Sequence, residues 1–90
     1  MLQIKVFGTT PPCANCKRAE REALKAAGAF PGEVEVLHLD ALGPEAEPFG
    51  LMVTPVIVVG GDVVATGKVI PAARLAPIIQ HHLEDEHGQA

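Results

Sequence analysis

The chain has 90 residues, a formal net charge of −4 at pH 7 and a hydrophobic fraction of 48%. This length suits one domain, and the hydrophobic fraction is that of a globular chain rather than a disordered one. The sequence holds no apolar run of about 18 residues, which argues against a membrane span. It also has no basic patch with interleaved aromatic side chains, which argues against nucleic acid as a partner.

The first forty residues predict a strand, a helix and a second strand. Residues 2–7 alternate apolar and polar side chains, as a half-buried strand does. Good helix formers follow over residues 14–27, and Gly28 suits the end of that helix. Residues 33–39 alternate again, and Asp40 ends the second predicted strand. We expect the buried face of the helix to be formed by Cys16, Ala19 or Glu20, Ala23, Leu24 and Ala27.

The middle of the chain predicts a short helix and a hairpin. The short helix fits residues 44–49. Pro55 then opens the β-branched run PVIVV, which predicts a third strand. The turn signal Gly60-Gly61-Asp62 leads into a returning strand over residues 63–66.

The last predicted element is a helix within residues 71–83. It begins at Pro71 or Ala72, and we expect it to bend at Pro77, because proline cannot donate a backbone hydrogen bond. Acidic side chains follow where the helix dipole disfavours them. We therefore expect one domain over residues 1–83 and a flexible acidic tail over residues 84–90.

The order of these elements is β-α-β-α-β-β-α. A helix between the first two strands implies parallel pairing, whereas the hairpin is antiparallel. The expected class is therefore α/β, with a central mixed four-stranded sheet flanked by helices.

The stretch TTPPCANCKRAE holds both cysteines of the chain, Cys13 and Cys16. Two thiols at this spacing can exchange electrons, bind a metal or form a structural disulfide. The N-terminal residues lack the apolar run and cleavage site of a signal peptide, so we expect a cytoplasmic protein. A reducing cytoplasm disfavours a structural disulfide, and a close cysteine pair there is more often catalytic or metal-binding.

The position of Cys13 directly before a helix favours its thiolate. Unpaired backbone N–H groups and the positive end of the helix dipole both stabilise a negative charge there. Pro12 leads into the helix, and Lys17 adds positive charge, although Lys17 is equally well explained by a solvated helix face. Our hypothesis is that Cys13 attacks a disulfide and that Cys16, one helical turn further on, resolves the mixed disulfide.

The element order, the C-x-x-C motif that opens the first helix, and Val53-Thr54-Pro55 before the third strand resemble the thioredoxin superfamily. The closest resemblance is to small glutaredoxin-like, archaeal-type redox-active disulfide proteins. It implies a thioredoxin-like fold and thiol–disulfide oxidoreductase activity, with a cis Pro55 beside the cysteines and a Thr54 backbone that pairs with an extended partner. It also implies protein disulfides and an upstream reductase as partners, no bound cofactor, no metal, and a monomer.

The chain departs from these families at several points. No tryptophan precedes Cys13, and the first strand has no acidic residue that would serve as the buried proton acceptor of thioredoxins. The Gly60-Gly61-Asp62 sequence falls in the hairpin turn rather than at the glutathione signature of glutaredoxins. This makes glutathione a doubtful partner.

Two other functions remain open from these residues. The cysteine motif also looks like the loop of small domains that bind copper(I) or a similar soft ion, although the hairpin disagrees with their ferredoxin-like element order. A non-catalytic binding module that kept the fold is the third possibility. Zinc needs two further ligands, and no histidine, at His38, His81, His82 or His87, has a spacing that points back to the cysteines.

Overall fold

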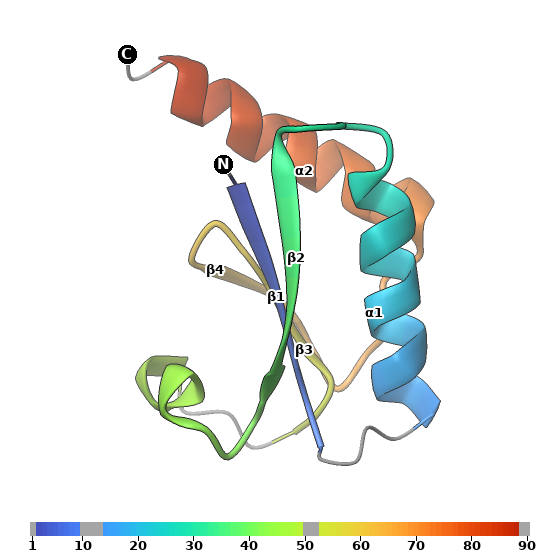
Figure 1. The fold of residues 1–90 in the computed structure, drawn as a ribbon, viewed down its shortest axis with the longest axis vertical. Helices are drawn as coiled ribbons and strands as arrows, with labels where there is room; N and C mark the ends of the chain where they lie inside the picture. Colours follow the sequence, from blue (N-terminus) through green and yellow to red (C-terminus); the bar gives the residue numbers. More distant parts are fainter. Residues whose placement is uncertain (1, 10–13, 50–52, 89–90) are drawn as a thin grey trace.

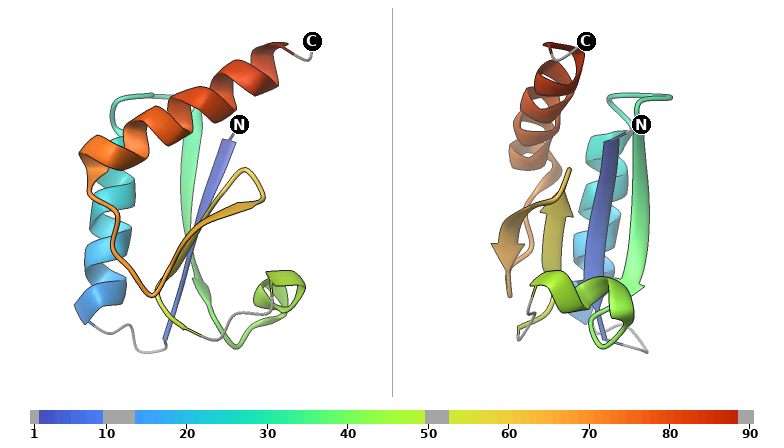
Figure 2. Two further views of the ribbon diagram at one scale, coloured as in Figure 1. Left: turned by 180° about the vertical axis from the view of Figure 1, so that it is seen from behind. Right: turned by 90° about the vertical axis from the view of Figure 1, so that its left-hand side faces the viewer.

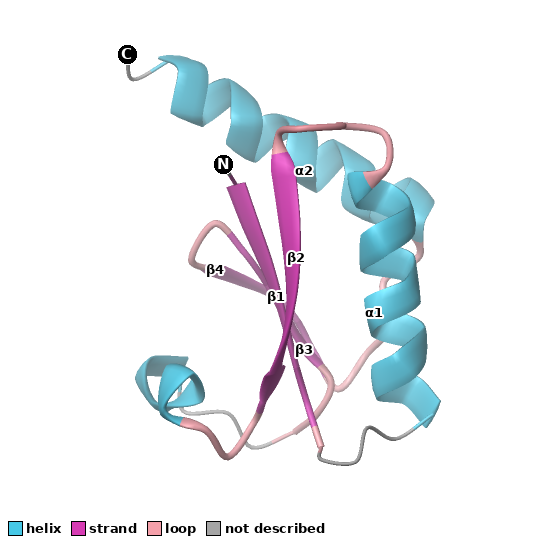
Figure 3. Ribbon diagram, in the orientation of Figure 1, coloured by secondary structure: helices cyan, strands magenta, loops and turns pink. Residues whose placement is uncertain are grey.

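A four-stranded mixed sheet runs through the middle of the molecule (Figure 1). The computed structural model describes residues 2–9, 14–49 and 53–88. Its elements, distinguished by type in Figure 3, are β1 (Leu2–Gly8), α1 (Ala14–Ala27), β2 (Val34–Asp40), the 3-10 helix η1 (Pro44–Phe49), β3 (Val56–Val59), β4 (Asp62–Thr66) and α2 (Ala72–Gly88). The predicted element order is confirmed.

The strands lie in the order β2-β1-β3-β4. β1 pairs parallel with β2 through the α1 crossover and antiparallel with β3, which in turn pairs antiparallel with β4. Strands β1 and β3 are therefore the two inner strands. This position explains why all four residues of β3 are buried, since both faces of an inner strand are covered.

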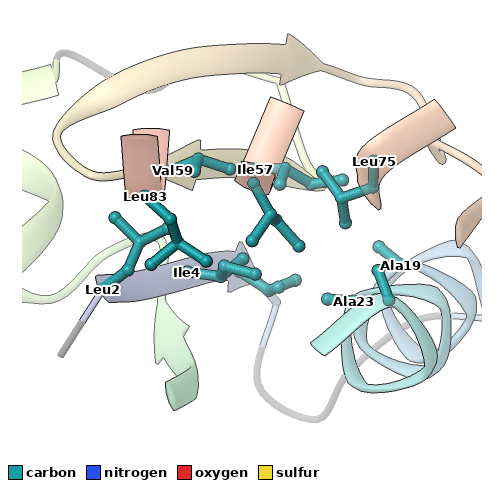
Figure 4. Packing of buried hydrophobic residues seen from close by; sticks show 11 residues of the cluster. Leu2, Ile4, Ala19, Ala23, Ile57, Val59, Leu75 and Leu83 are labelled. Carbon is teal, nitrogen blue, oxygen red and sulfur yellow. The ribbon is translucent and has the colours of Figure 1, made fainter. Parts of the chain in front are cut away.

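Both long helices pack on one face of the sheet, whereas η1 lies on the opposite side (Figures 1 and 2). The main core forms between that face and the two helices (Figure 4), and its buried members are Leu2, Ile4, Val6, Ala19, Ala23, Ala26, Ile57, Val59, Leu75, Ile79 and Leu83. A smaller cluster on the η1 side contains Phe7, Ala46, Val56 and Val58. The predicted flanking helices are thus present, but α1 and α2 share a face.

The buried face of α1 is rotated from the predicted one. Cys16, Ala19, Ala23 and Ala26 are buried, but Leu24 is 54% exposed. These buried positions follow the three- and four-residue steps of a helix, and position 24 lies beside this stripe rather than on it. The prediction assigned Leu24 inward because it is apolar, whereas the alanines allow α1 to lie close to the sheet.

The β3–β4 turn is formed by two glycines with positive φ, at 57° for Gly60 and 92° for Gly61. A two-residue hairpin turn whose twist matches the strands requires this conformation, and glycine adopts it without a Cβ clash. β4 begins directly after it, at Asp62.

Helix α2 begins where a side chain of α1 meets its first turn. The Ala72 backbone N–H donates to Glu22 Oε1 at 2.8 Å, so a carboxylate satisfies one of the donors that a helix start leaves unpaired. The prediction that the helix ends by residue 83 is wrong, because α2 continues to Gly88. Gln80 donates to Glu84, and His81 lies 3.8 Å from Asp85, so pairs one turn apart support the last turns. Within the described residues, no helix has the length and apolar character that crossing a bilayer requires.

Candidate functional site

Three segments that are distant in sequence meet at one end of the sheet. β1 ends at Gly8, α1 begins at Ala14, and Val56 opens β3. Phe7 pairs with Val56 in the antiparallel β1–β3 register, so the end of β1 and the start of β3 lie together. In Figure 1 the start of α1 lies at this lower end of the sheet. Cys16 and the Thr54–Pro55 pair, which are parts of the predicted site, lie at this end.

Of the two cysteines, the structure describes Cys16. Its side chain has no exposed surface and lies in the first turn of α1. Cys13 and Pro12 lie outside the described residues, although Cys13 is the residue directly before the first residue of α1 in the sequence. Lys17 is exposed, so its charge faces solvent beside the buried Cys16.

Gly8 allows Cys16 to approach the sheet closely. A Cβ added at Gly8 would lie 3.0 Å from both the Cβ and the Sγ of Cys16. That separation is shorter than carbon and sulfur atoms normally tolerate, so the sulfur occupies the space that a larger residue would fill. The Cys16 thiol therefore packs directly against the backbone of Gly8 at the end of β1.

A histidine side chain also lies close to Gly8. His38 Nε2 lies 3.3 Å from the position of that hypothetical Gly8 Cβ. Its other ring nitrogen, Nδ1, lies 3.4 Å from Glu20 Oε2, and the two side chains are 26% and 35% exposed. Thr9 Oγ1 lies 4.0 Å from Cys16 Sγ. The buried thiol is thus surrounded by a hydroxyl and by an imidazole that a carboxylate holds.

No spacing along the sequence points from His38 back to the cysteines, but the fold brings His38 close to Cys16. The parallel register pairs Val6 with His38 and Gly8 with Asp40. Because side chains alternate along a strand, His38 shares the face of Val34 and Val36, and both of those residues pack against the core beneath the helices. Had the parallel register of β1 and β2 been predicted, it would have placed His38 beside the end of β1, the strand that precedes the cysteines in the sequence.

The Thr54–Pro55 peptide bond is cis. The resemblance implied a cis bond at this position, and the structure has one. The Pro55 side chain is buried, and its carbonyl accepts a 2.8 Å hydrogen bond from the Gly67 backbone N–H. Thr54 is half-buried and Val53 is 58% exposed, so the approach to Pro55 borders on solvent.

Possible metal ligands do not gather in the part of the chain that the structure describes. Among residues 2–9, 14–49 and 53–88, no group of three or more histidine, cysteine, aspartate or glutamate side chains is placed to hold an ion.

Comparisons with known proteins agree on one family. The family model described as "Thioredoxin domain" matches residues 2–80. A protein named thioredoxin from Methanocaldococcus jannaschii is 36% identical over 64 residues, which cover 69% of this chain and 74% of that protein.

Solved structures show the same architecture. Chloroplastic thioredoxin z superposes with a TM-score of 0.72 at 23% identity, over 90% of this chain and 77% of that one. Thioredoxin-2 of the malaria parasite gives a TM-score of 0.71 at 18% identity, over 91% and 84% of the two chains. The expected thioredoxin-like fold is confirmed.

Proposed function

Because the chain belongs to the thioredoxin family, whose general activity is thiol–disulfide exchange, we propose that it cycles a Cys13–Cys16 pair between dithiol and disulfide. The observation that carries this proposal is the buried Cys16 thiol, which lies in the first turn of α1 against Gly8, three residues after Cys13. A buried thiol is protected from other disulfides in solution, but it is only three residues from Cys13 in the sequence. This arrangement suits a resolving cysteine.

The proposed reaction has two steps. The Cys13 thiolate attacks a partner disulfide, forms a mixed disulfide and releases the first partner sulfur as a thiolate. The Cys16 thiolate then attacks Cys13 Sγ, which forms the Cys13–Cys16 bond and releases the second partner sulfur. Two electrons pass from the protein to the partner disulfide. The released thiolates take up protons, and an upstream reductase returns the protein to the dithiol.

The substrates we propose are protein disulfides presented in an extended segment. Thr54 and Pro55 stand before an inner strand at the site end of the sheet, and the exposed Val53 precedes them. An extended peptide could add its main chain beside the Thr54 backbone, as strands add to an exposed edge. In this proposal Pro12 and Lys17 favour the Cys13 thiolate, and the protein acts as a cytoplasmic monomer without a bound cofactor. Glutathione remains a doubtful partner.

A redox titration tests this function. The protein is equilibrated in dithiol buffers of graded potential, and its free thiols are counted at each potential. We expect one reversible two-electron couple in the range of known oxidoreductases, roughly −120 to −270 mV. Anaerobic titration with copper(I) is the matched alternative. Tight binding of one copper ion without such a couple would overturn the proposal in favour of soft-metal binding.

The two cysteines should respond differently to substitution. Cys16→Ser keeps the attacking thiol and should accumulate mixed disulfides with partner proteins, because the resolving thiol is gone. Cys13→Ser should accumulate none. Nonreducing electrophoresis of each variant after exposure to a protein disulfide distinguishes them, and equal trapping by both variants would contradict the assigned roles.

A further inference from the structure

The Cys16 thiol and the His38 imidazole are an acid and a base that can exchange a proton. His38 of β2 and Cys16 of α1 meet over Gly8 at the end of β1, and Glu20 of α1 contacts the other side of the His38 ring. Cys16 Sγ and His38 Nε2 both lie within 3.3 Å of the single position that a Gly8 Cβ would occupy. They therefore border the same small volume beside Gly8, and proton transfer between them would run through one water molecule.

In the resolving step, Cys16 must lose its proton before it attacks the mixed disulfide, because the thiolate and not the thiol is the nucleophile. Burial disfavours the charged form of any acid, so a thiol with no exposed surface gains most from a base held next to it. Neutral imidazole is such a base, since histidine is the side chain that exchanges protons near neutral pH. The first strand supplies no carboxylate for this task, as its sequence LQIKVFG shows.

We propose that His38 accepts the Cys16 proton during the resolving step and that Glu20 positions the His38 ring. This inference rests on the proposed function and assigns the chemistry of its second step. A carboxylate on Nδ1 holds the ring in the tautomer that leaves Nε2 free to accept, and it stabilises the imidazolium that forms.

The proton and electron balance is complete. The Cys16 thiol gives its proton to His38 Nε2, and the resulting thiolate attacks Cys13 Sγ. The S–S bond to the partner breaks, the Cys13–Cys16 bond forms, and the partner sulfur leaves with the electron pair. The imidazolium then returns its proton to that leaving thiolate or to solvent, which restores neutral His38.

Few other charged groups face this ring. Among the described residues, α1 contributes Cys16 and Glu20, and β2 contributes Asp40, two positions along on the same face. The Oδ1 atom of Asp40 accepts from the Leu42 backbone N–H at 2.8 Å, so that carboxylate is turned toward its own loop. The β1 neighbour Val6 is apolar. Glu20 is thus the carboxylate that contacts His38.

A chromogenic aromatic disulfide such as dithiobis-nitrobenzoate separates the two steps. When the reduced protein meets this reagent in single turnover, attack by Cys13 releases the first chromophore and attack by Cys16 releases the second. In His38→Gln we expect the first release to keep its rate. The second should slow by at least about tenfold at pH 7, since general-base assistance contributes on the order of 100-fold or more.

The pH profile distinguishes a base from a structural residue. The difference in the rate of the second release between the wild type and His38→Gln should shrink as pH rises, because solvent hydroxide then ionises Cys16 without the imidazole. His82→Gln is the matched control, because His82 also contacts a carboxylate at 3.4 Å but through Asp62. It should leave both releases unchanged.

A wild-type rate and pH profile for the second release in His38→Gln would overturn the inference. Failure of the underlying function looks different, because the wild type would then show no second release that depends on Cys16. Should His38→Gln not fold, Glu20→Gln decides the question at a partly exposed site. A slower second release with an unchanged first release supports the positioning role of Glu20, and wild-type behaviour overturns it.

Discussion

Two histidine–carboxylate pairs lie at opposite ends of β1 and invite comparison. His38 Nδ1 lies 3.4 Å from Glu20 Oε2 at the site end, and His82 Nε2 lies 3.4 Å from Asp62 Oδ2 at the other. Each joins a helix to a strand. In chemical composition and separation the two pairs are nearly the same.

Each histidine also packs over a glycine, but the third neighbour differs. Beside His38, a Cβ at Gly8 would meet the sulfur of Cys16; beside His82, a Cβ at Gly60 would meet Leu2 Cδ1. A buried thiol can exchange a proton with an imidazole, whereas a leucine methyl group cannot. The comparison teaches that the neighbour, rather than the pair itself, decides whether such a pair takes part in chemistry or only holds elements together.

The largest expected loss of stability comes from adding a side chain at Gly60, beside His82. Gly60→Ala places a Cβ 2.9 Å from the His82 ring and forces a non-glycine residue to φ +57°. Left-handed backbone costs about 1–2 kcal/mol and overpacking about 1–3, so we expect a loss of about 2–5 kcal/mol in the free energy of unfolding. Urea unfolding measures this loss. The folded fraction should keep its rate of disulfide exchange, and a reduced rate per folded molecule would break the comparison.

The same substitution at the site end should affect both properties. Gly8→Ala crowds Cys16, and we expect a loss of about 1–3 kcal/mol in unfolding free energy. It should also slow disulfide exchange by at least about tenfold, because an error of 1 Å in the position of a reacting group costs up to about 100-fold. Urea unfolding and disulfide-reduction kinetics measure the two effects.

The control for Gly8→Ala is Gly32→Ala, at a glycine with φ +78° and no atom within 4 Å of the added Cβ. It should lose about 1–2 kcal/mol of stability through backbone conformation alone. Its exchange rate should not change. If both alanine variants exchange at the wild-type rate, Gly8 has no special role at the site.

Glu22, a carboxylate of α1 that contacts only the start of α2, serves as a control for Glu20. Glu22, two residues after Glu20, accepts from the Ala72 N–H at the start of α2. Glu22→Ala should cost about 1 kcal/mol in unfolding free energy, as the loss of a helix cap typically does. Thermal or urea unfolding measures this cost. Glu22→Ala should leave the pH profile of the resolving step unchanged, in contrast to Glu20→Gln.

The smallest effect is expected for the structural histidine. Asp62 is 75% exposed, so its pair with His82 is screened by solvent, and His82→Gln should cost less than about 1 kcal/mol. Added salt should reduce even this difference. Unfolding curves of the wild type and the variant at low and high salt check the expectation. A loss of several kcal/mol would mean that His82 acts mainly through packing.

Much of the fold was predictable because it depends on local patterns. The helix over residues 14–27, the turn at Gly60-Gly61 and the segment 44–49 all match their predicted positions. The errors arose where a contact outside the local pattern decided the outcome. Leu24 is apolar but exposed, because the position of α1 on the sheet selected the alanine stripe. Helix α2 extends beyond its predicted end because side-chain pairs one turn apart support its last turns.

The sequence by itself determined the order of elements, the C-x-x-C motif before the first helix and the proline that precedes β3, because each is a local signal of composition and spacing. Only the tertiary structure decided that His38 would lie beside Cys16. The two residues are on different elements, and their meeting depends on the parallel register of β1 and β2 and on a glycine that leaves space between them. The strand register and the close approach of two side chains depend on how elements pack together, so no local pattern in the sequence predicts them.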